Sequence, residues 1–133
     1  MLDGCWVLLM GSVVVDVKVR GPRGEVVVKA LVNTGFYGDL LTRPDVVEGT
    51  GIEFRYERWR VLPNGRRIKV RYGLGEIWLF DVVTGGDIEV WERLRLPEGV
   101  DVLLGVTALE KLGYRVNLRT EELEKVELYL LHL

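Results

Sequence analysis

The residues best suited to chemistry lie in a small polar turn, Asn33-Thr34-Gly35, which separates a valine-rich run ending at Val32 from the pair Leu40-Leu41. The side-chain amide of Asn33 donates and accepts hydrogen bonds, but it neither takes a proton from water nor gives one at ordinary pH. Thr34 adds a hydroxyl, and Gly35 allows the backbone to turn tightly. The turn therefore presents an amide, which can bind by hydrogen bonds, where a carboxylate could also act as an acid or a base.

Other reactive arrangements do not occur in the sequence. His132 has no cysteine, histidine or carboxylate partners at the spacing of a metal site. The sequence also has no glycine-rich phosphate loop followed by a lysine, and no nucleophile elbow. We therefore expect neither a metal nor a cofactor.

Length and composition predict one domain, residues 1–133, with 48% hydrophobic and 29% charged residues. The formal net charge of −2 gives no bulk attraction to nucleic acid or to a membrane. Cys5, the single cysteine, excludes an internal disulfide framework and fits a reducing compartment, so we expect a cytoplasmic protein. The apolar runs near the start are too short for a membrane-spanning helix.

Strands must position the polar turn. Residues 12–21 alternate valines with charged residues, the GPRG stretch at 21–24 predicts a turn, and residues 25–32 run back as a strand to Asn33. Residues 36–52 predict a short strand, then Pro44 and a helical turn or two. Residues 53–83 predict a long hairpin whose turn is Pro63-Asn64-Gly65, because Asn-Gly tolerates positive φ.

The later residues predict further strands and one helix. TGGD at 84–87 reads as a turn, residues 88–96 as a strand, and residues 99–106 as a short strand buried on both faces. Thr107 is the expected N-cap of a short helix that ends at Gly113, with Leu109 and Leu112 on one face. The segment 120–133 fits either a helix or a strand. The four tryptophans, Trp6, Trp59, Trp78 and Trp91, are expected to pack in the core or a cleft.

Together, the hairpin that leads into ALVNTGFYGDLL, the glycine-tipped hairpin and the run VDVLLGVTALEKLGYRVN resemble the retropepsin-like aspartic proteases of clan AA. The resemblance is to the small archaeal and bacterial members and covers about Val13 to Leu118. In that group a strand ends in Asp-Thr-Gly or Asp-Ser-Gly, a flap hairpin follows, and an apolar strand ending in Leu-Gly opens a short helix. The resemblance implies an all-β, retropepsin-like closed barrel or sandwich with one short helix near the C-terminus.

The same resemblance implies an endopeptidase site shared by two chains. Two carboxylates that share one proton activate a water, and one chain holds only one such turn, so the site requires a homodimer. Thr34 and Gly35 would frame residue 33, and the apolar strand would support the turn from below, which explains a small residue at Gly105. The candidate substrate-binding residues are Phe36, Tyr37, Leu62, Pro63, Asn64 and Gly65. The resemblance also makes residues 5–10 and 126–133 candidates for an intersubunit sheet.

Asn33 departs from the family pattern, because it stands where the catalytic aspartate is expected. With an amide in both subunits no general base remains, and each positioned acid or base contributes about 10²–10⁴-fold. We therefore expect an inactive chain, either inactivated deliberately from an aspartate parent or naturally non-catalytic. The alternative function is a peptide-binding dimer of the same fold. Asp39 is not expected to replace the missing acid, and we expect it to face solvent or bond to a turn.

The predicted flap hairpin is strongly basic. Its cations are Arg55, Arg58, Arg60, Arg66, Arg67, Lys69 and Arg71, with Tyr56, Trp59 and Tyr72 between them. Such a hairpin could bind nucleic acid, but its alternation favours a solvated strand face balanced by acids such as Glu121, Glu122, Glu124 and Glu127. We therefore expect a peptide or protein partner in the cleft, no membrane, and no nucleic acid.

Overall fold

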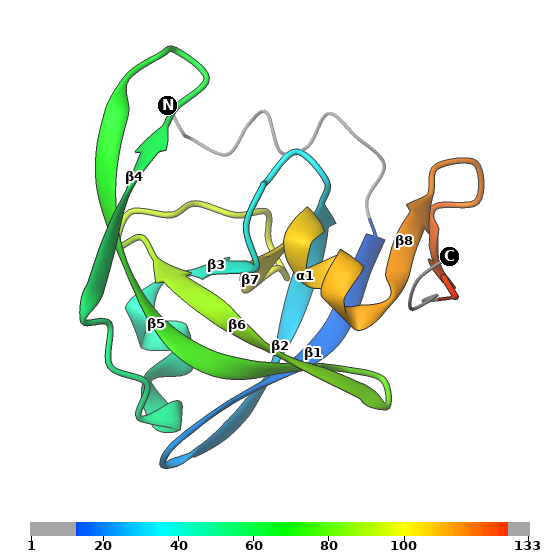
Figure 1. Cartoon of the computed structure of the whole chain (residues 1–133), viewed down its shortest axis with the longest axis horizontal. Coiled ribbons are helices and arrows are strands. Elements are labelled where there is room, and N and C mark those ends of the chain that lie inside the picture. The colour runs from blue at the N-terminus through cyan, green and yellow to red at the C-terminus, as the bar shows by residue number, and fades with distance from the viewer. Residues whose placement is uncertain (1–12, 128–133) are drawn as a thin grey trace, which may run out of the picture.

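The computed structural model describes residues 13–127, which form an all-β fold with one short α-helix (Figure 1). The strands are β1 (Val13–Gly21), β2 (Gly24–Asn33), β3 (Leu40–Thr42), β4 (Tyr56–Val61), β5 (Arg67–Leu79), β6 (Val82–Val90), β7 (Val102–Gly105), β8 (Tyr114–Asn117) and β9 (Glu122–Lys125). A 3-10 helix, η2 (Pro44–Thr50), follows β3, and α1 (Val106–Leu112) follows β7. The predicted fold class, an all-β closed barrel with a short helix late in the chain, is confirmed.

Six strands close the barrel. They are hydrogen-bonded in the order β1-β2-β7-β3-β6-β5, and β5 pairs again with β1. β4 pairs with β5 alone among the described strands, so the β4–β5 hairpin extends beyond the barrel (Figure 1). Barrel closure pairs the backbone groups that a sheet edge leaves open. Within residues 13–127, β4 therefore presents an open edge that the barrel strands do not.

β7 lies between two strands that are consecutive in the chain. It runs parallel to β2 and antiparallel to β3, and all four of its residues are buried. Val102 and Leu104 join the main core cluster, whereas Leu103 joins a second cluster that contains Leu31 and Leu41. The sequence prediction of a short strand buried on both faces is confirmed.

The first two predicted hairpins are also confirmed. β1 and β2 pair throughout, from Val13 with Val32 to Gly21 with Gly24. The β4–β5 turn contains Gly65 at φ +85, with the Leu62 N–H donating to the Arg66 carbonyl. The α1 helix ends at Gly113 with φ 83, and Leu109 and Leu112 are buried together as predicted.

Several local predictions were wrong. Residues 84–87 lie inside β6, and the preceding turn is formed by Phe80 and Asp81 instead. β6 ends at Val90, so the predicted strand 88–96 is mostly loop. Thr107 is not the N-cap of α1, because Gly105 occupies that position without a side-chain cap. Trp59 is not packed inside, since 55% of its surface is exposed.

The ambiguous C-terminal segment forms a strand where it is described. β9 pairs antiparallel with β8 in a separate two-stranded sheet. The expectations for Cys5, Trp6, His132 and nearly all of the candidate interface segments 5–10 and 126–133 fall outside the described residues. No helix in the 13–127 region is both long and apolar enough to cross a membrane.

Candidate functional site

The polar turn forms as β2 ends. Asn33 is the last residue of β2 and pairs with Gly105 of β7. Its side-chain oxygen Oδ1 accepts the Gly35 N–H at 2.9 Å, and its backbone carbonyl accepts the Phe36 N–H at 3.1 Å. An asparagine that bonds to the backbone two residues ahead closes such a turn locally. Thr34 and Gly35 are exposed, so the turn presents its middle to the surface.

The other half of the Asn33 amide is left without a partner. Its Nδ2 atom is buried and has no hydrogen-bond acceptor among the residues that the structure describes. The orientation of the amide follows from chemistry, because only the oxygen can accept the Gly35 N–H. A buried donor without an acceptor costs about 1–3 kcal/mol. A group that supplies an acceptor at this point would therefore stabilise the turn.

Gly105 supports the turn from below, as the resemblance implied. A Cβ atom at this position would lie 2.0 Å from the Gly38 carbonyl oxygen and 2.6 Å from the Phe36 ring. The Gly105 N–H donates to the Asp39 carbonyl at 2.9 Å, and the Val106 N–H donates to the Phe36 carbonyl at 3.0 Å. The loop 34–39 thus lies directly on the junction between β7 and α1, and only glycine allows this approach.

Asp39 fastens the same loop through its side chain. Its carboxylate is buried and accepts hydrogen bonds from the Thr107 hydroxyl at 2.6 Å, the Lys111 ammonium at 2.8 Å and the Asp87 N–H at 2.9 Å. Burial alone would raise the pKa of Asp39, but these hydrogen bonds and the Lys111 charge outweigh it, so the pKa is lowered below 3.8. The residue joins the loop, β6 and α1.

The expectation that Asp39 faces solvent or bonds to a turn was wrong. Neither Thr107 nor Lys111 was predicted to bind Asp39, although they lie four residues apart and therefore share one face of α1. A hydroxyl and an ammonium on one helix face are a signal for a buried acceptor. Nothing in the sequence identifies Asp39 as that acceptor, because 72 residues separate it from Lys111.

The predicted substrate-binding residues divide into two groups. Phe36 is partly buried against the cluster of Leu31 and Leu103, while Tyr37 is 73% exposed. Arg60 of β4 connects this loop to the hairpin, since it donates to the Tyr37 carbonyl at 2.7 Å and lies 5.1 Å from the centre of the Phe36 ring. The end of β4 next to the hairpin turn is therefore joined to the loop that carries Asn33.

The hairpin tip is placed differently. Pro63, Asn64 and Gly65 are exposed, and Leu62 is partly buried. Figure 1 shows the tip and the loop 34–39 at the same end of the barrel. Among residues 13–127, however, no hydrogen bond joins the tip to the Asn33 turn.

The inner face of the hairpin carries a buried ionic cluster. Glu89 of β6 is 1% exposed and is bonded to Arg60 through both of its oxygens. Arg58 forms an ion pair with Asp87 and lies 3.6 Å from Glu89. The prediction that tail acids such as Glu121 and Glu122 balance these arginines was wrong, because the balancing acids belong to β6.

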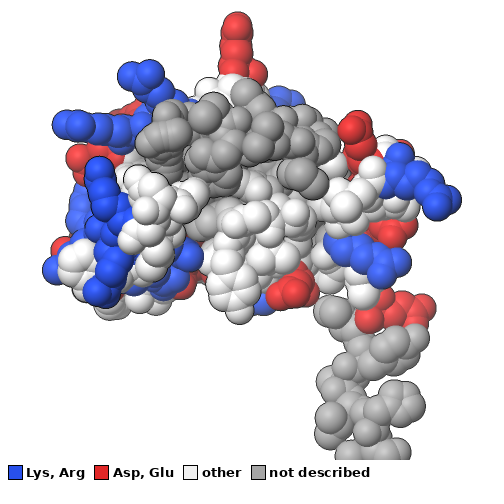
Figure 2. Space-filling model, turned by 90° about the horizontal axis from the view of Figure 1, so that it is seen from above, with Lys and Arg blue, Asp and Glu red and all other residues white. Residues whose placement is uncertain are grey.

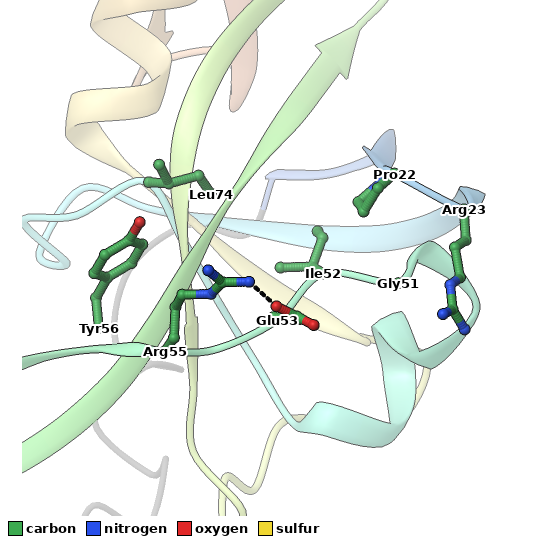
Figure 3. Close-up of a pocket in the computed structure, with 8 residues that line it drawn as sticks. All are labelled: Pro22, Arg23, Gly51, Ile52, Glu53, Arg55, Tyr56 and Leu74. Carbon is green, nitrogen blue, oxygen red and sulfur yellow. Dashed lines mark hydrogen bonds and ion pairs between the residues drawn. The ribbon is translucent and has the colours of Figure 1, made fainter.

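A separate hollow of about 500 Å³ lies near the β1–β2 turn, at the opposite end of the barrel from the Asn33 turn (Figures 1 and 3). Ile52, Arg55, Tyr56 and Leu74 are among its lining residues, and Arg55 forms an ion pair with Glu53 there. None of the predicted site residues lines it. Over the described part of the chain, no three His, Cys, Asp or Glu residues are grouped to hold a metal.

Comparison with known proteins gives a likeness among solved structures. No family model matches the chain, and no curated protein matches it. Among solved structures, it is similar to the retroviral protease-like domain of Ddi1 from Leishmania major, with 15% sequence identity and a TM-score of 0.48. The match covers 84% of this chain and 87% of that chain. A likeness of this extent assigns no function.

Proposed function

We propose that the chain is a retropepsin-like aspartic protease domain that binds extended peptides as a homodimer, with Asn33 in the position of the dyad aspartate. One observation carries the proposal. The Asn33-Thr34-Gly35 turn ends β2, lies directly on Gly105, and is supported by the strand β7 inserted between β2 and β3. The sequence resemblance predicts an apolar strand that supports a catalytic turn from below and a small residue at Gly105.

The exposed middle of the turn supports a second copy of the chain as the missing partner. Thr34 and Gly35 are exposed, whereas the Asn33 Nδ2 beside them is buried without an acceptor within residues 13–127. Across a twofold axis each chain meets the same residues of its copy, so the exposed hydroxyls and backbone groups of the two turns can bond to each other. One chain brings one such turn, and the proposed site is incomplete without its copy.

The amide determines what the dimer can do. In an aspartate form, two adjacent carboxyls share a proton, one activates the water, and the other protonates the peptide group. Asn33 supplies neither a base nor an acid, and its Oδ1 already accepts the Gly35 N–H. The chain as written therefore holds peptides without cleaving them. The second candidate is a domain whose only role is peptide binding, which the local hydrogen bond from the Gly35 N–H to Oδ1 favours.

The test is Asn33→Asp, assayed against a mixed peptide library at acidic pH, with Asn33→Ala as the matched control. We expect cleavage by the aspartate variant and none by the alanine variant or the original chain. Sedimentation should show a dimer for the original chain. A dimeric aspartate variant without cleavage leaves the peptide-binding domain as the function. A monomer at all accessible concentrations contradicts the proposed site altogether.

A further inference from the structure

The two faces of the β4–β5 hairpin differ in how their cations are paired. The cross-strand pairs Trp59 with Lys69 and Val61 with Arg67 place these side chains on the outer face. Arg58 and Arg60 lie on the inner face and are neutralised by acids of β6. Figure 2 shows Lys and Arg gathered at the left end of the molecule, where Figure 1 places the hairpin.

The outer face keeps unmatched positive charge. Within the described residues, neither Arg67 nor Arg66 at the tip has a carboxylate partner. Lys69 forms a long ion pair of 3.7 Å with Glu57. Trp59 is 55% exposed and Val61 is 68% exposed, so apolar surface lies among the cations. An exposed aromatic and aliphatic surface with excess cations suits a partner that brings carboxylates on an extended chain.

The open edge of β4 supplies the backbone groups for such a chain. The Leu62 N–H donates to the Arg66 carbonyl, so Leu62 and every second residue before it direct their backbone groups toward β5. Ladder bonds alternate along an antiparallel strand, so Glu57, Trp59 and Val61 direct their backbone N–H and C=O away from β5. An added strand would therefore pair at the three residues whose side chains lie on the outer face.

The cations of the outer face already reach over β4. The guanidinium of Arg67 lies 4.9 Å from the centre of the Trp59 ring, and the ammonium of Lys69 lies 5.2 Å from it. Both charges thus lie beside the position of an added strand, although Arg67 and Lys69 belong to β5 and not to the edge strand β4. The same contacts occupy the Trp59 ring, which leaves it less suited to stacking a nucleic acid base.

We propose that the outer face and open edge of the β4–β5 hairpin bind an extended acidic protein segment, which adds to β4 as a strand and directs carboxylates to Arg66, Arg67 and Lys69. This surface is distinct from the Asn33 turn. It does not rest on the proposed dyad, because the residues that form it belong to the hairpin alone.

The first experiment tests the charge. A fluorescein-labelled decapeptide with glutamate at alternate positions is titrated against the full chain by anisotropy, beside the same peptide with glutamine. We expect the glutamate peptide to bind at least about tenfold more tightly. Arg67→Glu with Lys69→Glu should weaken it by about tenfold or more. The control, Arg119→Glu with Lys125→Glu, changes the net charge equally on an exposed distant surface and should alter binding less than about twofold.

The second experiment tests strand addition. Val61→Pro removes an N–H that faces the open edge and leaves the ladder to β5 intact, whereas Val61→Ala removes only side-chain surface. We expect the proline variant to weaken binding at least about fivefold and the alanine variant less than about twofold. Both variants are first checked for native circular dichroism. If Val61→Pro misfolds, Glu57→Pro replaces it, because Glu57 also directs its N–H to the open edge.

Three results would overturn the inference. Equal binding of the glutamate and glutamine peptides removes the role of the cations. Unchanged binding by the proline variants removes strand addition. Tighter binding of an oligothymidylate than of the acidic peptide identifies a nucleic acid as the partner instead. Because Asn33 is unchanged in every protein used, these outcomes are independent of the cleavage assay with the aspartate variant.

Discussion

Asn substitution at Asp39 tests whether the buried carboxylate holds the candidate site together. In Asp39→Asn, one carboxylate oxygen becomes an NH2 group that cannot accept a hydrogen bond. If the remaining oxygen keeps the Thr107 hydroxyl, the bonds from Lys111 and from the Asp87 N–H are lost. The substitution is nearly isosteric, so its cost reports hydrogen bonding and charge rather than a cavity.

The expected cost follows from the two lost partners. A hydrogen bond to a charged group contributes about 1.5–3 kcal/mol, and a donor left buried without an acceptor costs about 1–3 kcal/mol. The Lys111 side chain is 44% exposed and can turn to water, which places its loss at the low end. We expect Asp39→Asn to lower the free energy of unfolding by about 3 kcal/mol, out of a typical 5–15 kcal/mol.

The assay is urea unfolding followed by tryptophan fluorescence at one fixed protein concentration, since a dimer makes stability depend on concentration. Asp45→Asn is the matched control, because that side chain is 68% exposed and pairs with Arg43 on the surface. It should cost less than about 0.5 kcal/mol. A loss in Asp39→Asn no larger than in this control would refute the role of Asp39.

The pH dependence provides an independent check. The pKa of Asp39 is lowered in the folded chain, so its ionised form stabilises the fold above the unfolded pKa, near 3.8. This stabilisation is lost as the pH falls through the lower, folded pKa. The stability difference between the original chain and Asp39→Asn should be constant above about pH 5 and shrink below about pH 4. A constant difference down to the acid unfolding transition would contradict this linkage.

Two further predictions concern the elements around the turn. Gly105→Ala should cost more than about 3 kcal/mol or prevent folding, because its Cβ would lie 2.0 Å from a backbone oxygen. Gly85→Ala, which meets nothing within 4 Å, should change the melting temperature little; equal effects of the two substitutions would contradict the packing described here. Arg60→Met should cost about 3 kcal/mol in urea unfolding, because it leaves the buried Glu89 carboxylate with a weaker partner. Adding Glu89→Gln should recover part of that loss, and strictly additive costs would show that the pair is not coupled.

Local sequence patterns predicted much of the barrel. They failed where a residue type is explained by packing against a residue that is distant in sequence. The Gly85-Gly86 pair suggested a turn, yet it lies within β6. A Cβ at Gly86 would lie 2.8 Å from Ile77 and 3.1 Å from the Asp39 carboxylate, so this glycine permits close packing. The real turn contains Phe80 at φ 55, a residue that sequence rules do not associate with positive φ.

The amino-acid sequence by itself determined the alternating strands β1 and β2, the glycine turn of the β4–β5 hairpin, and the placement of Asn33 at the end of a strand. These features depend on backbone preferences and on the periodicity of neighbouring residues, which a short stretch of sequence is enough to show. Only the tertiary structure decided that Asp39 is buried between Thr107 and Lys111, and that β6 neutralises Arg58 and Arg60. Those partners are distant in sequence, and only closure of the barrel brings their charges close enough to pair.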